Sequence, residues 1–136
     1  MFEILVATLI VKDNKVLMVK EKKEEVKGLL NLPAGHLESN ESLIEGAMRE
    51  VLEETGKKIK ITQLLETKHF SQKGKDYVAF VFQGAEIEYN TENELEYEYY
   101  DIEYLKENPT ILRNEKLILS AINKMNSGST DAIKYL

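Results

Sequence analysis

The segment from Ser42 to Thr55 constrains the fold most, because it carries the clearest helical pattern in the chain. Its apolar residues recur at the spacing that gathers them on one face of an α-helix: Leu43, Ile44, Ala47, Met48, Val51 and Leu52. Ser39 and Asn40 are the candidate N-caps, and Gly56 is expected to end the helix in the left-handed conformation. The sequence therefore predicts a helix over 42–55 with a sharp end.

Segments rich in branched apolar residues lie on both sides of this helix. Phe2 to Val11 predicts a buried strand, and the turn signal Asp13-Asn14 followed by Val16 to Val19 predicts a hairpin. Further strands are expected at 59–67, 77–87 and 95–102, loops at 20–27, 34–40 and 71–76, a bulge at Gly84, and a last helix over 115–125 ended by Ser127 and Gly128. This order predicts an α/β or α+β sandwich with a mixed sheet.

Composition narrows the class of protein. A length of 136 residues predicts one domain, residues 1–136. The lack of Cys excludes a disulfide scaffold, a thiolate zinc site and a Cys nucleophile. The longest apolar run, Ile4 to Val11, is far shorter than the roughly 20 residues of a membrane-spanning helix. Because Glu3 lies where a signal peptide carries positive charge, we expect a cytoplasmic protein without membrane contact.

The negative charge is concentrated in one part of the chain. Between Glu86 and Leu105 there are eight acidic residues and no Lys or Arg, against a net charge of −6 for the whole chain. Nucleic-acid backbones are bound by basic stripes, so a long nucleic acid is a poor partner. Small anionic substrates stay compatible with this charge if a divalent cation mediates their binding.

Three carboxylates gather on one side of the predicted helix. Glu50, Glu53 and Glu54 fall within a single arc away from the apolar face, where like charges destabilise a helix. Arg49 offsets part of this repulsion, because it can reach Glu45 and Glu53 one turn away. A bound divalent cation would offset the rest, and oxygen-only ligands favour Mg²⁺ or Mn²⁺.

The plain alternative is a solvated acidic helix face. Two neighbouring features weigh against it. The loop Pro33 to Gly35 can bring a backbone carbonyl to the start of the helix, and Gly46 leaves room on the acidic side for a loop or a ligand.

These residues together resemble the Nudix box, whose pattern is G-x5-E-x7-R-E-U-x-E-E-x-G-U with U apolar. Gly35 and Glu41 are followed at the required spacing by the run from Arg49 to Gly56, and every fixed polar and Gly position is present. The last apolar position is Lys57, so we expect a later strand start, with Ile59 in the apolar role. A second departure is Leu30, where many relatives have Trp. The surrounding motifs look most like a bacterial subgroup acting on nucleoside and thiamine-type pyrophosphates.

The resemblance implies a Nudix-type α/β/α sandwich that hydrolyses a diphosphate linked to another group, X. Glu50 and Glu54 would bind Mg²⁺, with Mn²⁺ as a substitute, and the Gly35 carbonyl would be a further ligand. Glu53 would be a further ligand or the general base, and Arg49 would orient the carboxylates. Glu41 would brace the junction of loop and helix, and His36 would lie beside the phosphate. An acid from outside the box would be Glu94, with Glu96 as the second candidate. Lys20, Lys22, Lys23 and Arg113 are candidates to meet distal phosphates.

Several readings stay open at this point. The general base is Glu53, Glu50 or Glu94. Like-charge repulsion is expected to raise the pKa of at least one glutamate of the box. The expected partner is a small phosphorylated substrate, most simply a nucleotide, and homodimers are common among the relatives. The alternatives to an enzyme are a catalytically silent Nudix domain that senses a nucleotide metabolite, or an interaction domain with an acidic surface. The complete set of box residues favours the enzyme.

Overall fold

The computed structural model describes residues 2–89, 92–125 and 136. Within them the strands are β1 (Phe2–Lys12), β2 (Lys15–Lys20), β3 (Leu30–Asn31), β4 (Ala34–His36), β5 (Lys57–Gln72), β6 (Lys75–Tyr89) and β7 (Tyr97–Asp101). The helices are α1 (Leu43–Thr55), α2 (Ile102–Glu107) and α3 (Glu115–Lys124), with 3-10 turns at Glu24–Val26 and Pro109–Ile111. The predicted end of the last helix, Ser127 and Gly128, lies outside the described residues.

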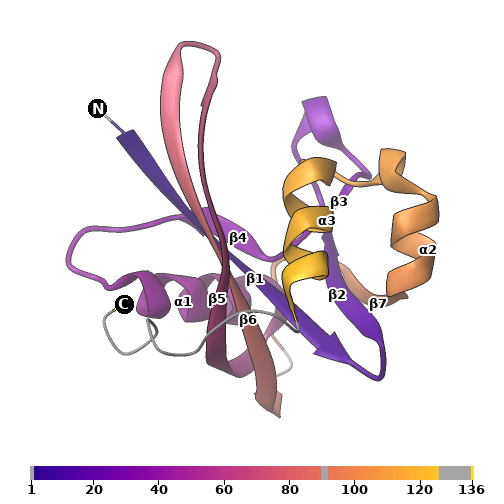
Figure 1. The fold of residues 1–136 in the computed structure, drawn as a ribbon. Helices are drawn as coiled ribbons and strands as arrows, with labels where there is room; N and C mark the ends of the chain where they lie inside the picture. Colours follow the sequence, from indigo (N-terminus) through magenta and orange to yellow (C-terminus); the bar gives the residue numbers. More distant parts are fainter. Residues whose placement is uncertain (1, 90–91, 126–135) are drawn as a thin grey trace.

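β1 organises a mixed sheet, as the sequence predicts. It runs parallel to β6 and antiparallel to β2 and β4, and the strand order is β3-β2-β1-β6-β5. β4 joins this path on β1, and β7 joins it on β2. Figure 1 shows α1 and α3 on opposite sides of the sheet, which confirms the expected sandwich.

Alternation along β1 builds two separate apolar layers. Val6 and Ile10 lie in the core layer that Ala47 and Val51 of α1 complete. Leu9 belongs to the opposite layer, which contains the apolar face of α3: Ile118, Ala121 and Ile122. Because successive side chains of a strand point to opposite faces, one strand supports both helices and fixes the position of α1 relative to the sheet.

The predicted helix 42–55 is confirmed, but its N-cap is not the expected one. Ser42 is the N-cap: its Oγ accepts from Glu45 N–H at 3.1 Å, and the Glu45 carboxylate accepts from Ser42 N–H at 2.7 Å. Ser39 and Asn40 were reasonable candidates by residue type alone, whereas the capping box needs a Glu three residues on. At the other end Gly56 has φ 73°, the left-handed cap that the sequence predicts.

The long hairpin of β5 and β6 extends further than the sequence predicts. Lys73 and Gly74 both have positive φ and form a two-residue turn, so the expected loop 71–76 is largely strand. The pairing register shifts between Ile61 and Gln63 on β5, opposite Gly84, close to the expected bulge. A Cβ on Gly84 would lie only 3.0 Å from side-chain carbons of Thr8 and Ile59, so this glycine permits close packing.

The strand after the helix begins at Lys57, two residues earlier than expected. Lys57 opens β5 directly after the helix cap and is only 6% exposed. Its Nζ lies 3.1 Å from Glu86 Oε1 and 5.2 Å from the ring centroid of Tyr97, and the Tyr99 hydroxyl donates to Glu86 Oε2 at 3.1 Å. An ion pair and aromatic faces therefore accommodate a lysine at a usually apolar position, while Ile59 is buried as expected.

Two other predicted segments differ from the structure. The strand expected over 95–102 is only β7, because Ile102 already begins α2 and is buried in the core. The expected loop 34–40 begins with β4, in which Gly35 pairs with Val6 of β1. This pairing is what ties the box loop to the sheet. Among the described residues, no helix has the length and apolar character needed to cross a membrane.

Candidate active site

Gly35 and Glu50 form the closest approach between the box loop and the helix. A Cβ on Gly35 would lie 2.3 Å from the Glu50 carboxyl carbon, so the carboxylate rests directly against the glycine backbone. Only glycine fits there without displacing Glu50. Burial raises the pKa of Glu50, the Arg49 guanidinium opposes this, and the charges of Glu53 and Glu94 add to the rise.

Glu54 is the carboxylate that the fold buries most deeply in this region. Its Oε1 accepts from the backbone N–H of Ala34 at 3.0 Å, which joins the helix to β4. Burial raises the pKa of Glu54 to about 8, helped by the carboxylates of Glu50, Glu21 and Glu94. The expected rise in a box carboxyl thus occurs, but desolvation rather than like-charge repulsion is its leading cause.

Arg49 connects the carboxylates to one another and to the loop. Its Nη1 donates to Glu50 Oε1 at 2.8 Å, and its Nη2 donates to Glu41 Oε1 at 2.8 Å and to the carbonyl oxygen of His36 at 3.1 Å. Glu53 is more distant, at 3.3 Å, and its side chain is 43% exposed. The expected partner Glu45 is instead used in the helix cap. Arg49 therefore orients Glu50 and Glu41 firmly and Glu53 only loosely.

Glu41 fixes the loop that leads into the helix. Its Oε1 accepts from Glu38 N–H at 2.8 Å in addition to the bonds from Arg49. A Cβ on Gly46 would lie 2.9 Å from this oxygen and 2.7 Å from Leu37 Cδ1. Gly46 was expected to leave room for a loop or a ligand, and the structure shows that it leaves room for two loop side chains, Leu37 and Glu41.

The segment before β7 closes the C-terminal end of α1. The backbone N–H groups of Glu94 and Leu95 donate to the carbonyl oxygens of Glu53 and Glu54 at 3.0 and 3.1 Å. Glu94 contributes its charge to the pKa values of Glu50 and Glu54, which places it beside the box carboxylates. Glu94 and Glu96 precede β7, so Glu96 lies outside the strand that was expected to begin at residue 95, and it pairs with Lys20 at 3.6 Å.

The donor set fits a hard divalent cation in its chemistry. The Gly35 backbone, Glu50, Glu54 and Glu94 supply oxygen, the ligand type of Mg²⁺ and Mn²⁺. In the described part of the chain, however, no three acidic or His side chains are grouped closely enough to hold a metal ion. Glu50 instead contacts Arg49. The carboxylates are thus gathered around the loop, and the bond from Arg49 occupies only one of the two Glu50 oxygens.

A cavity of about 360 Å³ lies beside this cluster and is called the inner cavity here. Gly35, His36 and Glu54 line it on one side. Glu21 and Arg113 line it as well and form an ion pair with each other. The His36 imidazole contacts Glu3 through Nε2 at 2.9 Å, and Lys22 and Lys23 complete a basic part of the lining.

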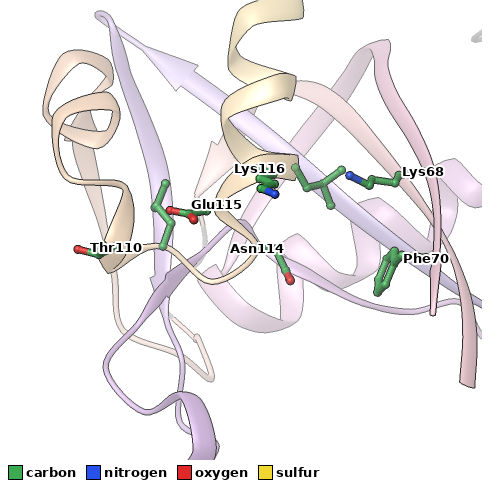
Figure 2. Close-up of a pocket in the computed structure, with 8 residues that line it drawn as sticks. Lys68, Phe70, Thr110, Asn114, Glu115 and Lys116 are labelled. Carbon is green, nitrogen blue, oxygen red and sulfur yellow. The ribbon is translucent and has the colours of Figure 1, made fainter. Parts of the chain in front are cut away.

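A second cavity of about 500 Å³, the outer cavity, shares Phe70, Asn114 and Leu117 with the inner one. Figure 2 shows Lys68 and Phe70 of β5 on one side of it, opposite Asn114, Glu115 and Lys116 at the start of α3. The two cavities therefore lead from the acidic cluster to a site with one aromatic ring and several polar side chains.

Some of these residues are beyond reach of sequence reasoning. Glu21 lies in a segment that reads only as a charged loop, and its partner Arg113 is distant in sequence. Phe70 carries no motif, and its ring stacks on Tyr77 at 5.2 Å between centroids. His69, the neighbour of Phe70 on β5, contacts Phe2 and Asp76.

Comparison with known proteins finds a family that matches most of the chain. The NUDIX domain family matches residues 2–119. Over 57 residues the chain is 44% identical to the ADP-ribose pyrophosphatase of Methanocaldococcus jannaschii, covering 42% of this chain and 34% of that protein. Over 79 residues it is 34% identical to the 8-oxo-dGDP phosphatase of Mus musculus, covering 58% of this chain and 24% of that protein.

A solved structure extends the likeness to the whole fold. A NUDIX hydrolase from Nitrosomonas europaea superposes with a TM-score of 0.83 at 28% identity, covering 93% of this chain and 90% of that one. The chain spans only 24% to 34% of the length of the first curated relatives it matches. From the family match over residues 2–119 and the complete box around Gly35 and Glu54, we conclude that the chain belongs to the Nudix hydrolase family.

Proposed function

We propose that this protein hydrolyses a pyrophosphate bond in a nucleoside di- or triphosphate, or in another small molecule that contains a diphosphate. The observation that carries this proposal is the placement of Glu54 and the Gly35 backbone in the wall of the inner cavity, which also contains basic side chains. The activities in the names of the relatives, a pyrophosphatase and a phosphatase of nucleotide compounds, support the same reaction class.

The residues proposed to hold Mg²⁺, or Mn²⁺ in its place, are Gly35 through its carbonyl, Glu50, Glu54 and Glu94, with Glu53 as a ligand in the alternative to its role as the base. When bound, such a cation supplies positive charge against the diphosphate and increases the acidity of a nearby water. Phosphoryl transfer otherwise needs positioning and charge stabilisation, which a buried carboxylate cluster beside a cavity provides.

Glu53 is the proposed general base. It is the most exposed acid that Arg49 contacts within the helix and the most loosely held, at 3.3 Å, so it is free to accept a proton from water. Glu50 and Arg49 act with it: Arg49 holds Glu50 at 2.8 Å and keeps it oriented toward the loop. Glu41 holds Arg49, and His36 is positioned by Glu3 at the cavity wall.

The test is a substrate panel with Mg²⁺ that measures phosphate and pyrophosphate release separately. The panel contains nucleoside di- and triphosphates, dinucleoside polyphosphates, nucleotide sugars and thiamine pyrophosphate. Turnover by the wild type that is lost in Glu53→Gln, with an unchanged melting temperature, supports the proposal. Tight binding of one compound without turnover of any would instead support a sensor. The cytoplasmic location expected from the sequence stays a prediction, and the oligomeric state stays open, although homodimers are common among the relatives.

A further inference from the structure

We infer that Arg113 binds the second phosphate of the substrate, the one farther from the acidic cluster, by exchanging its ion-pair partner Glu21 for that phosphate. The inference rests on the proposed function and adds a binding residue to it. It starts from the ion pair of Glu21 and Arg113, which lies in the same cavity as Glu54 and the Gly35 backbone.

The backbone of Arg113 is fixed, whereas its side chain reaches into the cavity. Arg113 N–H donates to the carbonyl oxygen of Leu30 at 2.8 Å, and Leu112 forms a parallel bridge with Leu30. Leu112 is also buried in the core, so the chain cannot shift easily at this point. A guanidinium on a fixed backbone beside a cavity is prepared to receive an anion without large rearrangement.

Glu21 places this guanidinium next to the acidic cluster. Its side chain is 12% exposed and ion-paired with Arg113, and its charge also acts on Glu54. Glu21 thus links the two other charged groups of the cavity lining, because its charge acts on Glu54 and its carboxylate pairs with Arg113. A diphosphate that has one phosphate at the acidic cluster would bring its other phosphate toward Arg113, where Glu21 now occupies the anion position.

Arg113 is better suited to this role than the lysines considered alongside it. Lys20 pairs with Glu96 and is not part of the inner cavity lining, while Lys22 and Lys23 line the cavity from a short loop. Arg113 donates to Glu21 through Nη1, and an arginine can present two parallel N–H donors to two phosphate oxygens in place of that carboxylate oxygen. Lysine provides a point charge without this geometry.

The position of Arg113 also sets where the rest of the substrate lies. The next residue, Asn114, lines both cavities, as do Phe70 and Leu117. An organic group attached to the second phosphate would therefore continue past Asn114 into the outer cavity (Figure 2). The inference thus favours substrates whose diphosphate carries an organic group on the phosphate that Arg113 binds.

The experiment uses methylenediphosphonate with Mg²⁺, a diphosphate that cannot be hydrolysed and that carries no organic group. Its dissociation constant is measured by calorimetry for the wild type, Arg113→Ala, Arg113→Lys and Glu21→Gln. Lys106→Ala is the control: it also removes one positive charge, and Lys106 pairs with Glu103 on α2, away from the cavity lining. Melting temperatures establish that each variant is folded.

We expect Arg113→Ala to weaken binding by roughly 10- to 100-fold, the usual effect of losing hydrogen bonds between charged groups. Arg113→Lys should recover part of that loss, Glu21→Gln should bind more tightly because the competing carboxylate is gone, and Lys106→Ala should match the wild type. If Arg113→Ala fails to fold, Arg113→Lys and Glu21→Gln still decide the question. Unchanged binding in folded Arg113 variants, or weaker binding in Glu21→Gln, overturns the inference.

Turnover separates this inference from the proposed function. With any substrate that the panel identifies, Arg113→Ala should raise KM by a factor similar to its effect on binding and change kcat much less. A wild type that hydrolyses substrates while Arg113→Ala keeps its KM refutes the role of Arg113 alone. A wild type without turnover refutes the proposed function, whatever the binding of methylenediphosphonate shows.

Discussion

The buried carboxyl of Glu54 makes the stability of the metal-free protein depend on pH in an unusual direction. Its pKa of about 8 in the folded chain exceeds the ordinary value of 4.5. Between these two pH values the unfolded chain releases this proton while the folded chain keeps it. The unfolded state then binds fewer protons than the folded one, so the free energy of unfolding falls as pH rises.

The magnitude follows from the same two values. The slope is at most about 1.4 kcal/mol per pH unit, which amounts to at most about 3 kcal/mol at pH 7 and about 5 kcal/mol above pH 9. Carboxyls with a lowered pKa, such as Glu41 and Glu66, add stability as pH rises, but they do so below their ordinary value of 4.5. The two effects therefore occupy separate pH ranges.

The assay is urea unfolding in EDTA at pH values from 5 to 9, for the wild type and for Glu54→Gln. Glutamine keeps the acceptor for Ala34 N–H but cannot ionise, so the difference between the two proteins isolates the titration of Glu54. We expect the free energy of unfolding of the variant, relative to that of the wild type, to increase steadily between pH 5 and 8. Added Mg²⁺ should reduce this difference most at high pH. A difference that is constant across this range would refute the reasoning.

Three further outcomes are expected. Glu53→Gln should lower kcat by roughly 10²- to 10⁴-fold, with an unchanged melting temperature; a simultaneous loss of the fold would count against the assigned role. Gly35→Ala should destabilise the protein by about 1–3 kcal/mol in urea unfolding, because its Cβ would overlap the Glu50 carboxylate, and a neutral result would contradict that contact. Lys57→Met should cost about 1–3 kcal/mol in urea unfolding, because Glu86 loses its cation and keeps the bond from Tyr99, and the double change with Glu86→Gln should recover much of it.

Local sequence patterns were sufficient to predict the helix and to identify the box, since both depend on residues that are close together in the chain. The apolar face of α1, the cap at Gly56 and the spacing from Gly35 to Glu54 are all legible within a short window. The N-cap could not be predicted in this way, because Ser39, Asn40 and Ser42 are equally suitable residue types. Only the reciprocal bonds with Glu45 select Ser42.

What the sequence could not provide are the partners that the fold brings from elsewhere. A lysine at an apolar box position suggested a displaced strand, but the structure keeps the strand and supplies Glu86 from β6 as the partner of Lys57. The pair of Glu21 and Arg113 depends on the bridge between Leu30 and Leu112, for which no local pattern exists.

The pairing of β4 with β1 has a consequence for how the site is assembled during folding. Gly35 reaches Glu50 only because β4 is pinned to β1 at Val6, and β1 is in turn held by its parallel pairing with β6, where Phe2 lies opposite Asp76. Parallel pairings between distant segments form slowly, because a long stretch of chain must be closed before they stabilise anything. We therefore expect an excised box peptide to form at best a frayed helix without the proposed cation site, and we expect refolding to form that site no earlier than the pairing of β1 with β6.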